Sequence, residues 1–228
     1  MIRTNNCLQI SILVLVAATL LFELTDIDML VQGSFYDAGT GQWLVDKNDQ
    51  IPRFIFYDGI KGVLLAFTAA LLIAAAVFGK KPRIAEYRKR LWLTLLSIVL
   101  ILATTSGLKA VTNVACPGQL SAFGGTIPHV KLFDAYPPGQ RPVKAQHCFP
   151  AGHASGGFAL LSLVFLFKTP RNRRLVVVAG LSLGWIMGLY KMFIGDHFLS
   201  HTVTTMLLAW CIICAISYVS NPSRSQTV

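Results

Sequence analysis

The sequence predicts an all-α integral membrane bundle of six transmembrane helices, with both termini cytoplasmic and residues 1–228 forming a single domain. The chain is 54% hydrophobic and only 13% charged, with a mean hydropathy of +0.59, whereas soluble domains carry about 25% charged residues. Its apolar residues form windows of roughly 20 residues, which is the length needed to cross the hydrocarbon core. We expect six such windows, at residues 8–25, 59–79, 91–108, 151–167, 175–194 and 198–219.

Three of these windows have features that set them apart. The first follows Arg3 and resembles a signal peptide, but no small-x-small cleavage pattern follows it, so we expect an uncleaved helix. The fourth is short and contains His153, so we expect it to begin at the membrane interface or in a cavity lined by protein. The fifth and sixth windows are separated by residues 195–197 alone, which predicts a tight turn between two antiparallel helices.

The basic residues predict the orientation of the bundle. The net charge is +10, and most of it lies in two short segments between apolar windows, where cytoplasmic loops carry an excess of Lys and Arg. Connections 26–58, 109–150 and 195–197 then face outward. Nucleic-acid binding requires an exposed basic face on a folded module, which this pattern does not offer. The two segments contain Lys80, Lys81, Arg83, Arg88, Lys89 and Arg90, and Lys168, Arg171, Arg173 and Arg174.

The five cysteines fall into two groups. Cys116 and Cys148 both lie in the second outward connection, where an oxidising compartment favours a loop-closing disulfide, worth about 3–4 kcal/mol by chain-entropy reasoning. The alternative is a pair of buried free thiols. Cys7, Cys211 and Cys214 lie in or beside predicted helices, where cysteine is usually a small apolar filler.

Four ionisable residues lie at the outward ends of predicted helices. They are Lys109, His153, Lys191 and His197. Ionisable groups in membrane segments are costly and usually functional, and the predicted topology brings all four to the same side. Each residue alone has an ordinary explanation, such as a headgroup contact or a lysine that snorkels to the interface. Their convergence favours a functional site.

The residue types in this cluster suit a phosphate ester. Two lysines supply positive charge, and the sequence Pro150-Ala151-Gly152-His153 opens a helix whose free N–H groups form an anion site. Gly152 allows the backbone to approach a ligand closely. Two histidines on different helices allow one to attack as a nucleophile while the other protonates the leaving oxygen.

At these residues the chain resembles the type 2 phosphatidic acid phosphatase family of membrane lipid phosphatases, and especially a bacterial branch of it. The family signatures are K-x6-R-P, P-S-G-H and S-R-x5-H-x3-D. Their counterparts here run from Lys109 to Cys116-Pro117, from Pro150 to His153, and from Tyr190-Lys191 through His197 to His201. The signatures therefore fall within residues 109–201.

The resemblance implies a role for each matched residue and no metal or other cofactor. His197 corresponds to the histidine that becomes a phosphohistidine, and His153 to the general acid. Lys109 and Lys191 correspond to phosphate-binding residues, together with the backbone at Ala151 and Gly152. The implied substrate is a lipid phosphate or diphosphate, and the implied location is a bacterial inner membrane with the site facing the periplasm. Neither the sequence nor the resemblance specifies an oligomeric state.

Four positions depart from the family pattern. Cys116 replaces an arginine, for which Arg141 is the nearest substitute in the same connection. Ala151 replaces a serine and so removes a hydroxyl donor. Whether Ser155 compensates for that hydroxyl is left open by the sequence. Lys191 keeps the charge of an arginine but loses its bidentate geometry. His201 replaces the carboxylate that orients the nucleophile, and a neutral His201 can still accept a proton from His197.

Alternatives from other classes remain open. His197 and His201 have the i, i+4 spacing of metal ligands, and with His153 or Asp196 they would make a zinc site. A transporter or scaffold without catalysis is a second alternative, although transporters usually break their helices at the midplane. Transfer of the phosphoryl group to another lipid instead of to water is a third.

Overall fold

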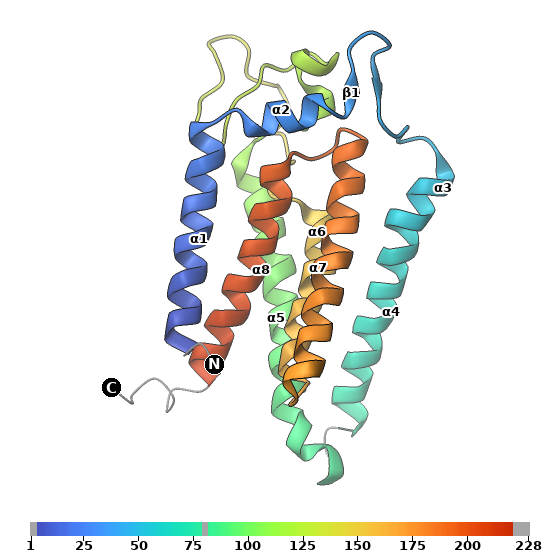
Figure 1. Ribbon diagram of the computed structural model, residues 1–228, viewed down its shortest axis with the longest axis vertical. Coiled ribbons are helices and arrows are strands. Elements are labelled where there is room, and N and C mark those ends of the chain that lie inside the picture. The colour runs from blue at the N-terminus through green and yellow to red at the C-terminus, as the bar shows by residue number, and fades with distance from the viewer. Residues whose placement is uncertain (1–3, 79–81, 221–228) are drawn as a thin grey trace.

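The computed structural model describes residues 4–78 and 82–220, which form a bundle of helices running side by side (Figure 1). Within these residues, five helices are long and apolar enough to cross a membrane, and a sixth apolar helix, Gly152–Phe165, is shorter. The predicted all-α membrane bundle is confirmed, and the chain is a multi-pass integral membrane protein. The five long helices are Asn6–Leu24, Gln50–Val77, Tyr87–Gln119, Pro170–Phe193 and Leu199–Ser220.

The observed helices lie close to the expected windows and differ from them mainly in where they begin and end. The third expected window begins at residue 91, but α5 begins at Pro82, because proline suits the first turn of a helix, and so it includes several of the basic residues. The fourth window is an α-helix only in its first half, and continues as the 3₁₀ segment η5. The main elements are α1 (Thr4–Leu24), α4 (Gly59–Ile73), α5 (Pro82–Thr112), α6 (Gly152–Ala159), η5 (Leu160–Phe165), α7 (Pro170–Phe193) and α8 (Leu199–Ser220).

The core lies where α5, α6, α7 and α8 meet, around the fully buried ring of Phe158. Small residues allow α6 and α7 to approach closely, as they do in many membrane helix pairs. A Cβ atom at Gly157 would overlap the backbone of Gly184, and one at Gly184 would overlap the Phe158 ring. The glycines therefore set the distance between these two helices.

Helices α1 and α4 lie at the two edges of the bundle (Figure 1). Only 6% of the apolar window in each of these two spans is buried, against 39% in the spans of α5, α7 and α8. The exposed apolar side chains of α1 and α4 are therefore available to lipid. Helix α4 is preceded by α3 (Gln50–Arg53) and by a π-helical turn, η1 (Phe54–Asp58), and is followed by a second one, η2 (Ala74–Phe78).

A cap of short elements covers one end of the bundle, opposite the end where α1 begins and α8 ends (Figure 1). Its strands pair antiparallel, with Tyr36 opposite Trp43. These two rings pack with Phe123, Leu120 and Phe198 in a small apolar cluster. Sequence pattern assigned no regular structure to this region. The cap comprises α2 (Ile27–Gly33), β1 (Tyr36–Asp37), β2 (Gln42–Trp43), η3 (Pro117–Gln119) and η4 (Ser121–Phe123).

The structure pairs four of the five cysteines. Cys116 and Cys148 are joined at the capped end, with Cα atoms 5.2 Å apart. Cys7 of α1 is joined to Cys214 of α8, with Cα atoms 6.0 Å apart, so these two residues are not the independent apolar fillers that their positions suggested. Cys211 is free.

Candidate active site

Three histidines from three segments form a chain of contacts beneath the cap. His153 lies in the first turn of α6, His197 in the connection between α7 and α8, and His201 in the first turn of α8. Nδ1 of His153 lies 3.5 Å from Nε2 of His197, and Nδ1 of His201 lies 3.4 Å from Nδ1 of His197. His197 is therefore the central member, and both it and His201 are only 1% exposed.

The turn that carries His197 is held at both ends. Gly195 has φ of +75°, a conformation that favours glycine, and a Cβ atom there would overlap the Trp43 ring of the cap. The N–H groups of Asp196 and His197 both donate to the carbonyl oxygen of Lys191, at 2.8 and 3.2 Å. These contacts fix the His197 backbone against the end of α7.

The start of α6 is attached directly to α8. Ala151, the N-cap residue, donates its N–H to the carbonyl oxygen of His201 at 3.2 Å, and its own carbonyl accepts from the hydroxyl of Thr205 at 3.3 Å. No side chain caps the helix, so the first-turn N–H groups remain available to an anion. The link between α6 and α8 places His153 beside His197.

Both predicted lysines lie at this site. Lys109 of α5 packs against Gly152, since a Cβ atom at Gly152 would lie 3.4 Å from the lysine Nζ. Lys191 of α7 is 8% exposed, and its Nζ lies 2.8 Å from Oδ2 of Asp196. Asp196 therefore pairs with a lysine and does not orient His197.

The structure decides between the substitutes considered for two departures from the signatures. The hydroxyl of Ser155 donates to the carbonyl oxygen of Gly152 at 2.7 Å, so it is turned toward its own helix and does not stand in for the hydroxyl absent at Ala151. Arg141 lines a separate pocket with Asn113 and Asp134. It is therefore not an evident substitute for the arginine absent at Cys116.

Sequence reasoning missed two residues near the site, Tyr57 of η1 and Lys61 of α4. The ring of Tyr57 meets that of His153 edge to face, with centroids 4.8 Å apart. The Nζ atoms of Lys191 and Lys61 lie 4.5 and 5.7 Å from the centroid of the same tyrosine ring. The sequence could have identified Lys61, because it is a charged residue at the predicted outward end of an apolar window, as Lys109 and Lys191 are.

The surroundings of His197 favour its neutral form. Burial, reinforced by His201, His153 and the two lysines, holds the pKa of His197 well below its usual range, because removal from water disfavours the charged imidazolium. A neutral imidazole keeps a lone pair on one ring nitrogen. The site therefore presents an unprotonated histidine beside lysine side chains.

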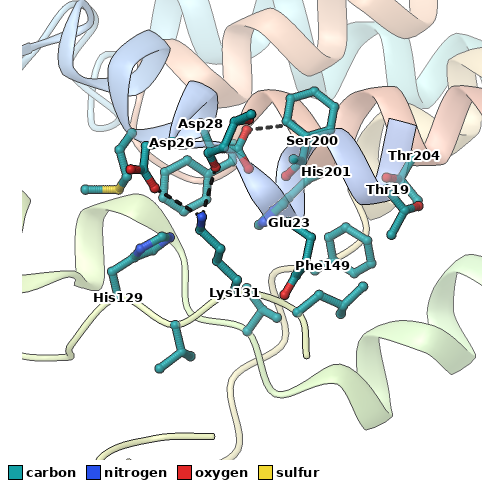
Figure 2. Close-up of a pocket in the computed structure, with 17 residues that line it drawn as sticks. Thr19, Glu23, Asp26, Asp28, His129, Lys131, Phe149, Ser200, His201 and Thr204 are labelled. Carbon is teal, nitrogen blue, oxygen red and sulfur yellow. Dashed lines mark hydrogen bonds and ion pairs between the residues drawn. The ribbon is translucent and has the colours of Figure 1, made fainter. Parts of the chain in front are cut away.

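A cavity of about 40 Å³ lies on the other side of His201, and Figure 2 shows residues that line it. It is lined by the C-terminal end of α1, by α2 and by the segment around Lys131. The carboxylate of Asp28 accepts the N–H of Ser200 at 2.8 Å and so caps the start of α8, although burial raises its pKa. His201 lines this cavity and contacts His197, so it separates the cavity from the lysine-lined site.

The zinc alternative finds no support in the arrangement of these side chains. Among the residues whose side chains the structure describes, no group of three or more His, Cys, Asp or Glu is placed to hold a metal ion. The ammonium groups of Lys109 and Lys191 would also repel a cation. The donor set therefore suits an anion better than a metal.

Fold and site together define an integral membrane protein with a histidine and lysine cluster at one end of its helices, suited to a phosphate group. The chain matches the family model described as the PAP2 superfamily over residues 90–225, and it belongs to that family. No curated protein and no solved structure shows significant similarity to it. Family membership identifies the chain as a phosphatase acting on phosphate esters.

Proposed function

We propose that this protein hydrolyses a lipid phosphate or diphosphate at the outer face of its membrane through a phosphohistidine on His197. The observation that carries the proposal is the contact chain from His153 through His197 to His201, beside Lys109 and Lys191. In this arrangement the buried, neutral imidazole of His197 lies between two other histidines. His153 can protonate a leaving group, and His201 can orient the His197 ring. This arrangement suits in-line transfer of a phosphoryl group.

The phosphate is bound by positive charge and by the start of α6. Lys109 and Lys191 neutralise its oxygens, and the first-turn N–H groups of α6, next to Ala151 and Gly152, donate to them. The same groups stabilise the charge on the equatorial oxygens in the transition state. A bound phosphate separates His153 from His197, whose nitrogens are 3.5 Å apart without it.

The first chemical step forms a phosphoenzyme. His197 carries its proton on Nδ1, and this N–H donates a hydrogen bond to Nδ1 of His201. The lone pair of His197 Nε2 is then free to attack phosphorus. The N–P bond forms as the bond from phosphorus to the lipid oxygen breaks. His153, whose protonated form is favoured by the negative charge of the bound phosphate, gives its proton to that oxygen, and the dephosphorylated lipid leaves.

The second step restores the enzyme. Water attacks the phosphorus of the phosphohistidine while neutral His153 accepts the proton from that water. The N–P bond breaks, inorganic phosphate leaves, and His197 returns to its neutral form with His153 protonated. No metal or other cofactor is required by this sequence.

The outer face is favoured by the charge pattern and by the cap. The basic segments that mark the cytoplasmic side are remote from the histidines in the predicted topology. The cap over the histidines is built from the two long connections that this topology places outside. Both observations support a site at the periplasmic face of a bacterial inner membrane.

Phosphate release by the detergent-purified protein tests the proposal. A panel of phosphatidic acid, phosphatidylglycerol phosphate, an isoprenyl diphosphate and lipid A is the substrate set. We expect wild-type protein to release phosphate from at least one lipid. His197→Ala should lower kcat by roughly 1,000-fold or more, as the loss of other covalent nucleophiles does. Lys47→Gln, which alters an exposed lysine of the outer connection, is the control. A folded His197→Ala protein with normal turnover would exclude the mechanism.

A further inference from the structure

Tyr57 and Lys61 approach the histidines from a part of the chain outside the region that defines the family. They lie on the continuous helix formed by η1 and α4, whereas the family match begins at residue 90. The ring of Tyr57 makes an edge-to-face contact with the ring of His153 and lies under the ammonium group of Lys191. A single aromatic ring thus contacts two groups of the proposed site.

Lys61 lies one helical turn beyond Tyr57, and its Nζ is 5.7 Å from the same ring. Residues four apart on a helix lie on one face, so both side chains point toward the same region. Lys61 is among the charges that act on His153. The ring that Lys61 approaches, that of Tyr57, packs against the ring of His153. Lys61 therefore lies on the His153 side of the site.

The charges of the three lysines are not equivalent. Lys191 is paired with Asp196 at 2.8 Å, whereas neither Lys109 nor Lys61 is paired with a carboxylate among the described residues. The first family signature also has Cys116 where an arginine is usual. Lys61 thus supplies a positive charge at a position that the family signatures do not include.

We propose that Tyr57 and Lys61 form a leaving-group subsite that favours lipid diphosphates over lipid monophosphates. The inference rests on the proposed function, in which His153 protonates the oxygen that leaves. The leaving group must then lie on the His153 side, where Tyr57 and Lys61 are. When the terminal phosphate of a diphosphate is transferred to His197, the leaving group is a lipid monophosphate, which carries its own negative charge. Lys61 pairs with that charge, and an uncharged alcohol gains nothing from it.

Farnesyl diphosphate and farnesyl phosphate test the subsite, because they share one tail and differ only in the second phosphate. Lys61→Gln is expected to lower kcat/KM for the diphosphate about tenfold or more, the loss typical of a charge-assisted hydrogen bond, and to change the monophosphate value less than about threefold. Lys61→Arg should retain the preference, and Lys47→Gln should alter neither substrate. Equal losses on both substrates, or no loss, would overturn the proposal.

Tyr57 has a separate readout. Because its ring, and not its hydroxyl, makes the contacts with His153 and Lys191, Tyr57→Phe should keep kcat while Tyr57→Leu lowers it about tenfold. Equal activity of the Phe and Leu variants would remove Tyr57 from the subsite.

A binding experiment separates failure of the subsite from failure of the proposed function. In the His197→Ala background, a methylene-bridged farnesyl diphosphate analogue should bind more weakly when Lys61 is also changed to Gln, and a farnesyl phosphonate should not. This result would support the subsite even for a wild-type protein that released no phosphate. Unchanged affinity for the bridged analogue would overturn it.

Discussion

His197 combines burial with a position between two other imidazoles. Its Nδ1 faces His201 and its Nε2 faces His153, so its two nitrogens have different surroundings and different proposed tasks. In the proposed step a histidine can attack phosphorus only through an unprotonated nitrogen. Low exposure and nearby lysines keep His197 in that state, and so both serve the proposed mechanism directly.

The protonation state of His197 is open to direct measurement. Because its pKa is held well below the usual value of about 6.5, His197 stays neutral as the pH falls from 8 through 6.5 and becomes protonated only at lower pH. Ring resonances of ¹³C-labelled histidine, with His197 assigned through a His197→Asn variant, should show no His197 titration near pH 6.5. A midpoint at or above 6.5 would contradict the buried, neutral imidazole.

His201 occupies the position where related signatures have a carboxylate. Changing His201→Asp places a negative charge beside His197, which favours the imidazolium and so raises the pKa of His197. The midpoint of its titration should move to higher pH by about one unit or more, whereas the uncharged His201→Asn variant should cause a much smaller change. Identical titrations in the two variants would show that position 201 does not face His197 in solution.

At the scale of helices, the close approach of α6 and α7 aligns the start of α6 with the turn after α7. Gly184→Ala would place a methyl group in the space of the Phe158 ring, and overpacking of this kind costs about 1–3 kcal/mol. We expect a lower unfolding temperature in detergent and a loss of phosphate release. Gly107→Ala on α5, where a Cβ atom would meet nothing within 4 Å, is the matched control. Equal stability of the two variants would refute this packing argument.

Most helices could be predicted because the bilayer imposes a length on apolar segments. The window for α8 and the turn at 195–197 correspond closely to the structure, whereas α7 begins at Pro170 and not at residue 175 as predicted. The start of α5 was predicted too late, since Pro82 and the basic residues after it form helix without being apolar. The 3₁₀ segment in the second half of the fourth span and the π-helical turns beside α4 have no periodic signal in the sequence, so they were not predicted.

At the scale of the whole molecule, the site depends on segments distant in sequence. The predicted residues Lys109, His153, Lys191, His197 and His201 are brought together, because the topology places one end of each helix under the same cap. Tyr57 was not predicted, since it lies in a connection with no regular pattern and approaches the site only through tertiary packing. The Asp196–Lys191 pair was also missed, because it depends on the bend at Gly195.

The pair formed by Cys116 and Cys148 links the end of α5 to the segment before α6. The two residues are separated by 32 positions, and closing such a loop stabilises a fold by about 3–4 kcal/mol. Reductant should therefore lower the unfolding temperature of a Cys7→Ala, Cys214→Ala variant, which keeps this pair alone, and should have a much smaller effect when Cys116→Ala and Cys148→Ala are added to it. Equal sensitivity of both proteins to reductant would show that this pair contributes nothing.

The central claim is that His197 carries the phosphoryl group during turnover, and rapid-quench trapping tests it most directly. The purified protein is mixed with a lipid whose terminal phosphate is ³²P-labelled, quenched in alkali within milliseconds, and digested for peptide mapping. We predict acid-labile, alkali-stable label on the peptide containing His197, present in wild type and in Lys47→Gln and absent in His197→Ala. Steady phosphate release with no label on His197, or label that persists in His197→Ala, would contradict the account.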